Sequence, residues 1–403
     1  MNAMITDEQR RWRLARRHRL IPGSRTDDIA AIADDLIGLH SSDPATVFLS
    51  AFVRMRKPSA ELVHAALYRD RSVVRHHAMR RTIWVMTPDI ARLAHGATTA
   101  KIAAKERRRT IGALEETTEV VDGEAWMRAA GEEIAALLNT EGPMTTRAIG
   151  QALPHLVVPM RMGATTKNPA TLNAHSKVLQ GAGFDGTLVR TSPTGDWTNA
   201  EYRWSPTVDW LEGGLAGGDE EQCAADLLAR WLLRFGPATD TDIRWWFGWT
   251  AGLARKSLAT IGAVDVELEG GDTGWLHPDD LDDLDELGGS ADPGPWVRLL
   301  PGLDPTAMGW KERDWYLDPA LVGELFDRFG NAGPTIWADG RIVGAWIQGA
   351  DGGILTRLVD ELGPEHRRLL TESIDELQAA LGDVIVRPRF PAPAQRDLLA
   401  ADR

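Results

Sequence analysis

The sequence predicts an α+β protein that is predominantly helical. An order of three helices followed by a β-hairpin occurs three times before residue 289, and short apolar strands dominate the rest of the chain. The 403 residues exceed what one hydrophobic core usually holds. We therefore expect four units, which cover residues 1–118, 119–215, 216–288 and 289–403.

Helical periodicity and proline positions define the first unit. An arginine-rich helix near 6–19 precedes a second helix near 26–39, whose apolar residues recur at helical spacing. Pro44 cannot continue a helix, so we expect residues 40–44 to be the end of this helix and the turn out of it. Helices near 45–55 and 59–69 follow, and SVVRHHAMRRTIWVM alternates like the two strands of a hairpin. This order is typical of a winged helix, in which a helix and the hairpin, the wing, contact DNA.

The next two units repeat this order. A helix near 124–139, a short helix capped by Thr145 or Thr146 and a helix over NPATLNAHSKVLQGAGF precede the hairpin GTLVRTSPTGDWTNAEYRWSP. The third unit combines a helix ended by Gly236, two shorter helices and the hairpin VDVELEGGDTGWL. Its WWFGW cluster is expected to pack a core, with a base-stacking platform as the alternative. Such repeats at irregular spacing indicate tandem winged helices rather than a solenoid.

The last unit has a different pattern, with strand-like apolar segments in place of the helix–hairpin order. WVRLLPGLDP, PTIWADGRIVGAWIQG and GGILTRLVDEL predict the strands of a small β unit. A charged amphipathic helix is expected near 364–381, and DVIVRPRF is expected to form a final strand.

Charge is distributed unevenly along the chain. The net charge is −13, yet residues 1–110 carry 21 Lys and Arg against 11 Asp and Glu. Residues 265–293 hold 11 acidic residues and no Lys or Arg. This asymmetry predicts a polyanion-binding N-terminal part and an acidic segment that keeps the polyanion on the basic side. The alternative is a first helix whose arginines are merely solvated.

Several kinds of site are disfavoured by composition. Cys223 is the one cysteine of the sequence, which excludes a disulfide framework and a cysteine-rich zinc site and fits a reducing cytoplasm. No apolar run reaches the length of a membrane span. Glycine-rich phosphate loops, P-loop lysines and His-Glu-x-x-His motifs are missing from the sequence, so we expect neither cofactor nor metal.

A polar island interrupts the apolar stretch LIGLHSSDPATVFLS. A neutral imidazole at His40 can accept a proton from a water molecule, because its pKa lies near working pH. Ser42 can hydrogen-bond the same water, and Asp43 can hold the ring or supply negative charge. The alternative is that Asp43 only caps a helix, a common role of Asp beside proline.

Two sharper interpretations of the island are disfavoured. A Ser42–His40 nucleophile–base pair would need an oxyanion-hole motif, and none is recognisable. A metal site on His40 and Asp43 would need further ligands at suitable spacing. The other histidines near in sequence, which are His64, His76 and His77, do not complete a tetrahedral set.

Five collinear segments resemble the AlkZ-type family of bacterial DNA glycosylases, winged-helix proteins that excise alkylated bases. They are LIGLHSSDPATVFLSAFVRMR, LYRDRSVVRHHAMRRTIWVMTPDI, RWLLRFGPATDTDIRWWFGW, VRLLPGLDPTAMGWKERDWYLDP and IWADGRIVGAW. The resemblance implies tandem winged helices and a C-terminal β unit that form a C-shaped clamp around duplex DNA.

The resemblance places the family's catalytic signature in the polar island. Typical members have Gln-x-Gln, or Gln-x-Asp in a subgroup, followed by Asp-Pro. Those two positions are His40 and Ser42 here, whereas Asp43 and Pro44 match the following pair. The resemblance implies that both positions line the cleft and hold a water beside the damaged nucleoside.

The wing and its neighbours supply the expected DNA contacts. Arg75, Met79 and Arg80 match the family's wing, while Arg81 replaces a usual glycine and Trp84 a usual histidine. We expect basic side chains of the first unit to contact the DNA backbone or groove, namely Arg54, Arg56, Arg75, His76, His77, Arg80 and Arg81.

Two functions are therefore weighed. The first is a monofunctional, monomeric DNA glycosylase that hydrolyses the N-glycosidic bond of alkylated purines in duplex DNA, with water positioned by His40 and Ser42. The second is a non-catalytic winged-helix DNA-binding protein, such as a repressor or lesion sensor. Both imply a cytoplasmic protein that associates with the nucleoid when bound to DNA.

Both functions predict a strong salt dependence of DNA binding. Arginine–phosphate contacts release condensed counterions, so affinity for duplex DNA is expected to fall steeply between about 50 and 200 mM salt. Fluorescence anisotropy of a labelled duplex measures this directly. An affinity that does not change with salt would contradict both functions.

Overall fold

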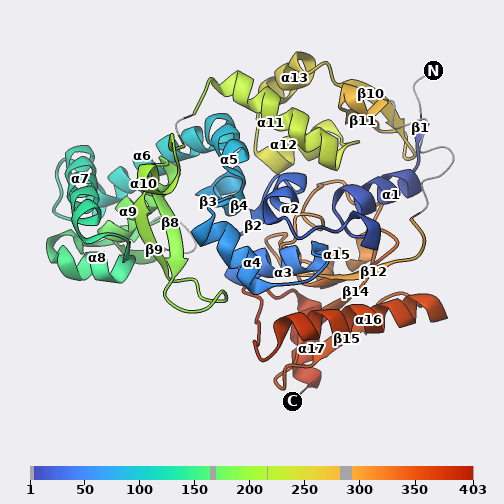
Figure 1. Ribbon diagram of the computed structural model, residues 1–403. Helices are drawn as coiled ribbons and strands as arrows, with labels where there is room; N and C mark the ends of the chain where they lie inside the picture. The colour runs from blue at the N-terminus through green and yellow to red at the C-terminus, as the bar shows by residue number, and fades with distance from the viewer. Residues whose placement is uncertain (1–3, 164–168, 216, 282–292, 403) are drawn as a thin grey trace.

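The computed structural model describes residues 4–163, 169–215, 217–281 and 293–402. Helices α7 to α9 lie at one end of the molecule, and the C-terminal sheet with α16 lies at the other (Figure 1). Small sheets and helices alternate between them, which confirms the mixed, helix-rich class. None of the helices in the described ranges is long and apolar enough to cross a membrane.

The first unit follows the predicted order, with one correction at the polar island. Helix α2 ends at Asp35 rather than near 39, and Ile37 and Gly38 have φ angles of 56° and 141°. A Cβ at Gly38 would lie 2.7 Å from Met86, so only glycine fits there. The chain then enters a short strand that contains His40. The elements are α1 (Asp7–Arg17), α2 (Ile29–Asp35), β2 (Leu39–His40), α3 (Pro44–Arg54), α4 (Ala60–His64), β3 (Val74–His77) and β4 (Ile83–Met86).

The three strands of this unit form one antiparallel sheet in the order β2-β4-β3. His40 pairs with Trp84, and Leu39 pairs with Val85. The hairpin was predicted, but its pairing with residues 39 and 40 was not, since a two-residue strand has no readable alternation.

The second unit contains the predicted helices and hairpin, with a difference at its third helix. Asn173 and the residues before it form β7, so α9 begins only at Ala174. The helix ends at Phe184, one residue after Gly183, as expected, and a Cβ at Gly183 would lie 3.1 Å from Trp204. Helices α5 (Pro88–Ala94) and α6 (Ala100–Thr117) end the first unit and lead into the second. The elements of the second unit are α7 (Gly123–Glu141), β5 (Met144–Thr145), α8 (Thr146–Ala152), β6 (Pro159–Met162), β7 (Ala170–Asn173), α9 (Ala174–Phe184), β8 (Leu188–Pro193), β9 (Tyr202–Pro206) and α10 (Thr207–Trp210).

The third unit also agrees with the predicted order. Gly236 ends α11 as expected, and Thr239 caps α12. An N-terminal strand, β1, pairs in parallel with β10, so the start of the chain joins this unit's sheet. The elements are β1 (Met4–Ile5), α11 (Glu220–Phe235), α12 (Asp240–Phe247), α13 (Ala251–Thr260), β10 (Val264–Leu268) and β11 (Thr273–Leu276).

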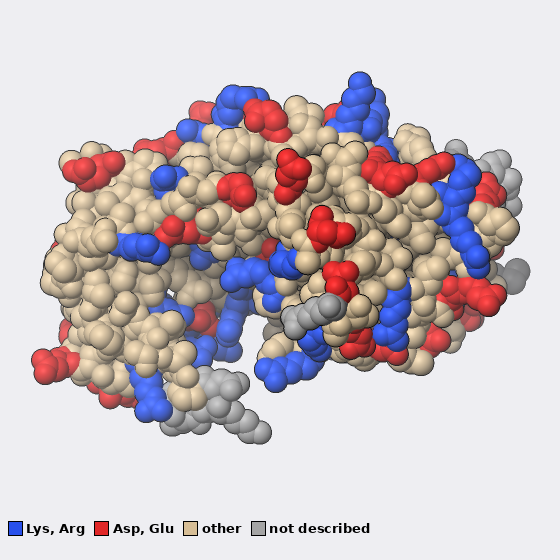
Figure 2. Space-filling view, turned by 90° about the horizontal axis from the view of Figure 1, so that it is seen from below, with Lys and Arg blue, Asp and Glu red and all other residues tan. Residues whose placement is uncertain are grey.

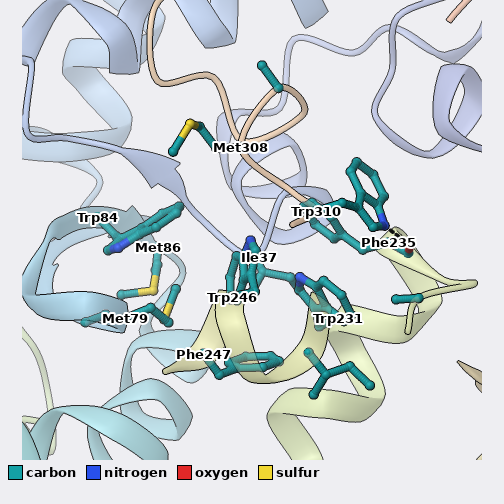
Figure 3. Close-up of a cluster of buried hydrophobic side chains, with 14 of the residues drawn as sticks. Ile37, Met79, Trp84, Met86, Trp231, Phe235, Trp246, Phe247, Met308 and Trp310 are labelled. Carbon is teal, nitrogen blue, oxygen red and sulfur yellow. Dashed lines mark hydrogen bonds between the residues drawn. The ribbon is translucent and has the colours of Figure 1, made fainter. Parts of the chain in front are cut away.

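The WWFGW cluster packs the core, as expected. Trp246 and Phe247 are 1% exposed and lie beside Trp231, Phe235 and other large apolar side chains (Figure 3). Trp249 is also buried, and its indole N–H donates to the carbonyl of Ala97 at 3.1 Å. The core therefore joins helices of the first and third units into one apolar cluster.

The C-terminal unit is built on a four-stranded antiparallel sheet in sequence order. Its elements are β12 (Val297–Leu300), α15 (Val322–Leu325), β13 (Thr335–Ala338), β14 (Arg341–Gln348), β15 (Ile354–Leu358), α16 (Pro364–Leu381) and α17 (Pro393–Ala401). The predicted strand DVIVRPRF is wrong, since this segment forms no ladder. The Val386 N–H and the Arg387 guanidinium donate to the side chain and carbonyl of Gln348 instead.

A buried ion pair connects the first unit to the C-terminal unit. Arg54, at the end of α3, donates to both carboxylate oxygens of Asp304 at 2.8 and 2.9 Å, and both side chains are fully buried. The Ser50 hydroxyl donates to the Asp304 carboxylate, and the Thr306 hydroxyl accepts a hydrogen bond from Arg54. Burial alone would raise the pKa of Asp304, but Arg54 and these hydrogen bonds hold it below its usual value. The predicted DNA contact at Arg54 is therefore wrong, because its guanidinium lies in the interior.

Removing one member of this pair is expected to destabilise the protein strongly. Arg54→Met leaves a buried carboxylate without its partner, which costs about 3–5 kcal/mol of unfolding free energy. The double variant Arg54→Met with Asp304→Leu should recover most of that loss, because it removes both charges. Urea unfolding measures each change, with the exposed Arg56→Met as the control. Equal stability of Arg54→Met and the natural protein would contradict this assignment.

Candidate active site

The polar island forms one wall of a pocket, which we call the cleft pocket. It has a volume of about 340 Å³ and lies where the first unit, the β8–β9 hairpin and the segment before α17 meet. Its lining combines hydroxyls, arginines and aromatic rings: Ser41, Ser42, Pro44, Ile83, Thr146, Arg190, Ala200, Glu201, Tyr202, Trp204 and Arg389. The view from below shows a hollow between two parts of the molecule, with Lys and Arg side chains gathered at its edges (Figure 2).

His40 lies behind this wall rather than in it. The side chain is 3% exposed, and its ring meets Trp84 edge-on at 4.8 Å between centroids. Its Nδ1 accepts the backbone N–H of Ser42 at 3.4 Å. Burial, with a contribution from the charge of Arg80, lowers the pKa of His40 to about 3. The imidazole is therefore neutral near pH 7, and it fixes the backbone that presents Ser42.

Asp43 caps helix α3, as one of the two interpretations predicted, and it also binds the backbone of Arg389. One carboxylate oxygen accepts the N–H of Ala45 at 3.2 Å and starts α3. The other accepts the N–H of Arg389 at 2.8 Å. Burial raises the pKa of Asp43, and these two backbone hydrogen bonds oppose that rise. Asp43 thus ties the C-terminal segment to the polar island.

Arg75 supports the pocket from behind. Its Nε donates to the Ser41 hydroxyl at 2.9 Å, and its Nη1 donates to the Tyr68 hydroxyl at 3.2 Å. The guanidinium also lies 4.2 Å from the centre of the Tyr202 ring. With only 4% of its surface exposed, Arg75 orients Ser41 and Tyr202 rather than reaching out of the molecule.

The two wing histidines are also internal, contrary to the predicted contact with DNA. His76 Nε2 and His95 Nδ1 are 3.2 Å apart, and the His77 ring packs on Phe184 at 4.2 Å. Both side chains are at most 4% exposed. Helix α9 covers His77 through Phe184, and His95 at the end of α5 covers His76, so both faces of β3 are buried, which strand alternation alone could not reveal.

The remaining predicted DNA contacts lie nearer the surface. Arg80 and Arg81 line a second pocket of about 450 Å³ together with Lys101, Lys105 and the start of α13. Arg80 also stacks on Trp245, with 4.1 Å between guanidinium and ring centre. Arg56 is 65% exposed and lies 3.5 Å from Asp27.

Two arginines of the arginine-rich first helix form ion pairs inside the protein. Arg13 and Arg17 bind the carboxylate of Asp280, a residue of the acidic segment, which is 2% exposed. The predicted role of that segment in steering DNA falls partly on residues 282–292, which lie outside the described residues.

Sequence reasoning missed most of the lining of the cleft pocket, including Arg190, Tyr202 and Arg389. Arg190 and Tyr202 come from the β8–β9 hairpin, and Arg389 comes from a segment that was expected to be a strand. Arg190 and Arg389 are ordinary strand and loop arginines in the sequence, with no motif around them. Only the contact between distant segments identifies them.

Comparison with known proteins agrees with this architecture. The family model described as DNA glycosylase AlkZ-like matches residues 33–384, so the chain belongs to the AlkZ-like DNA glycosylase family. The solved structure of Streptomyces sahachiroi DNA glycosylase AlkZ superposes with a TM-score of 0.72. That match covers 97% of this chain and 99% of the other at 19% sequence identity, and it establishes a shared fold. A search of curated proteins gives no significant match.

Neutral burial of His40 predicts a loss of stability in acid. Its pKa is about 3 in the folded protein and about 6.5 when unfolded. Below pH 6.5 the unfolded chain therefore binds the extra proton, and stability falls with pH by up to about 1.4 kcal/mol per pH unit from this group. Comparing urea unfolding at pH 7 and pH 5, His40→Gln should reduce the difference.

The control for that measurement is Gln151→Ala, an exposed substitution that changes no titratable group. It is expected to leave the pH dependence of the natural protein nearly unchanged. An identical pH dependence in His40→Gln would show that the ring is not held neutral in the fold.

Proposed function

We propose that the protein is a monofunctional DNA glycosylase that hydrolyses the N-glycosidic bond of alkylated purines in duplex DNA. The observation that carries the proposal is the position of Ser42, at the family's motif and in the wall of a polar pocket beside arginines. We further propose that the helix–hairpin units act as tandem winged helices in a C-shaped clamp around the duplex. The protein would work as a monomer in the cytoplasm, on nucleoid DNA.

The reaction places modest demands on the protein. Loss of the base gives an oxocarbenium-like sugar, and an N-alkylated purine is already cationic, so the base leaves as a neutral molecule. The protein must then position a water and favour positive charge on the sugar. In the proposed mechanism the Ser42 hydroxyl holds this water, because it is the motif side chain that lines the pocket.

His40 and Asp43 act through Ser42 in this proposal. His40 is too weak a base, with a pKa of about 3, to remove a proton efficiently. It is a positioning residue, which accepts the Ser42 N–H and sets the direction of the hydroxyl. Asp43 fixes the following turn and supplies negative charge near the sugar, where a cationic transition state gains from it.

DNA contacts in this proposal come from basic side chains at the surface. Arg80, Arg81, Lys101 and Lys105 line one pocket with a single carboxylate, Glu220, which leaves a net positive charge that suits a phosphate backbone. Arg56 offers a further exposed guanidinium near the start of α4.

A non-catalytic DNA-binding protein is the second candidate. Two observations favour it: imidazole and hydroxyl replace the family's usual amide pair, and His40 does not reach the cleft pocket. Such a protein would recognise DNA or a lesion without breaking a bond. Only a test for product formation separates it from the enzyme.

The enzyme is expected to release N7-methylguanine from a labelled duplex and leave an abasic site. Heating in alkali converts that site to a strand break, which a denaturing gel quantifies. Ser42→Ala should lower the single-turnover rate about 100-fold, because the water loses its positioning partner. Ser72→Ala, which lies outside the pocket lining, serves as the control and should retain the rate.

Two further variants test the motif. His40→Ala should also lower the rate, through loss of the bond that orients residue 42. A double variant with Gln at positions 40 and 42 restores the amide pair of typical members and should keep activity. Absence of breaks across a panel of alkylated duplexes, with duplex binding intact, would overturn the enzyme in favour of the DNA-binding protein.

A further inference from the structure

We infer that the cleft pocket contains a phosphate-binding site formed by Arg190, Arg389 and the Tyr202 hydroxyl. The site would hold one backbone phosphate of the DNA beside the nucleotide presented to Ser42. This inference rests on the proposed function, because it identifies which part of the DNA the pocket holds. It starts from unsatisfied groups in the pocket lining.

Arg190 has no counter-ion among the described residues. No ion pair or hydrogen bond joins its guanidinium to another described residue, and the guanidinium carbon lies 4.9 Å from the centre of the Trp204 ring. Among neighbouring groups, the like charge of Arg75 has the largest effect on its pKa. Burial, together with that repulsion, lowers the pKa of Arg190 to about 10. An incoming anion would relieve this cost.

Tyr202 supplies an unused hydroxyl in the same lining. The residue is 8% exposed, and its hydroxyl oxygen is buried with no hydrogen-bond partner among the described residues. Buried polar groups of native proteins nearly always have a partner. A phosphate oxygen in the pocket could accept the Tyr202 O–H.

Arg389 adds a second guanidinium from another part of the chain. Its backbone N–H is fixed by Asp43 at 2.8 Å, and its Nη1 donates to the Ser42 carbonyl at 3.2 Å. The side chain is thereby anchored beside Ser42, with further donors left for a ligand. Two guanidinium groups that line one pocket suit the tetrahedral oxygens of a phosphate.

One carboxylate also lines the pocket. Glu201 is turned toward the hairpin tip, where its carboxylate accepts the Thr194 hydroxyl at 2.9 Å and lies 3.7 Å from Arg147. Its charge is therefore shared with Thr194 of its own hairpin and with Arg147 of α8. The two pocket arginines leave a net positive charge for the anion.

A phosphate bound at this site would place one particular nucleotide beside Ser42. Phosphate contacts fix the register of a protein on DNA. A phosphate held between Arg190 and Arg389 sets the adjoining sugar against the Ser42 wall. Arg190 is thus a positioning residue, and its loss should affect both binding and rate.

The test uses duplexes in which one phosphate at a time is replaced by an uncharged methylphosphonate. The duplex carries a 2′-fluoro N7-methylguanine nucleotide, so its glycosidic bond resists cleavage during the binding measurement. The natural protein should lose about tenfold in affinity at one particular phosphate beside the lesion. Arg190→Gln should bind the unmodified duplex about tenfold more weakly and show no further loss at that phosphate.

Arg389→Gln, an exposed substitution, gives the same comparison if Arg190→Gln fails to fold. Arg190→Lys should recover part of the affinity, since it restores a charge. Arg128→Gln, on α7 outside the cleft pocket, is the control and should keep the full loss at the modified phosphate. The inference would be overturned if Arg190→Gln bound the unmodified duplex as tightly as the natural protein. It would also be overturned if the loss caused by Arg190→Gln added to the loss caused by the methylphosphonate at every position.

The outcomes separate this inference from the proposed function. A position-specific loss that disappears in Arg190→Gln, without any abasic product from a cleavable substrate, supports the phosphate site and rejects the enzyme. Normal product formation with no effect of Arg190→Gln on affinity, KM or kcat rejects the phosphate site alone.

Discussion

The buried ion pair between Arg54 and Asp304 sets the position of everything around the cleft pocket. Two charges can remain in an interior only when their hydrogen-bonding groups are satisfied, and here Ser50, Thr306 and the His18 carbonyl satisfy them. Because Arg54 ends α3 and Asp43 begins it, the pair fixes this helix against the C-terminal unit. The polar island is therefore held at the start of a helix that cannot shift without breaking a buried charge pair.

The start of α3 is tied to the C-terminal unit as well. Asp43 accepts one N–H from α3 and one from Arg389, so the first unit and the segment before α17 meet at the motif. The third wall comes from the β8–β9 hairpin through Tyr202, whose ring lies against Arg75. A pocket assembled from three distant segments depends on tertiary packing for its shape. Its hydroxyls and guanidinium groups are consequently held in place before any ligand binds.

The arginines of this structure fall into two groups, those that pair with buried carboxylates and those that do not. Arg13, Arg17 and Arg54 bind buried carboxylates and hold the fold together. Arg190 has no carboxylate partner among the described residues, and Arg80 stacks on Trp245 in a basic pocket. The excess of basic residues in the first 110 residues therefore overstates the charge available to DNA. A residue count cannot make this distinction, because it does not show which acidic side chains fold back on which arginines.

The sequence by itself determined the helix–hairpin order, the caps and the family motif, since these depend on local periodicity, proline, glycine and collinear segments. It also identified Asp43 as a helix cap. Only the tertiary structure decided that His40 lies on a strand behind the pocket, because β2 is two residues long and exists through its pairing with β4. The burial of Arg54, His76 and His77 likewise depends on helices and strands far away in the sequence. Arg190, Tyr202 and Arg389 became site residues only where three separate segments meet, and no local pattern encodes that meeting.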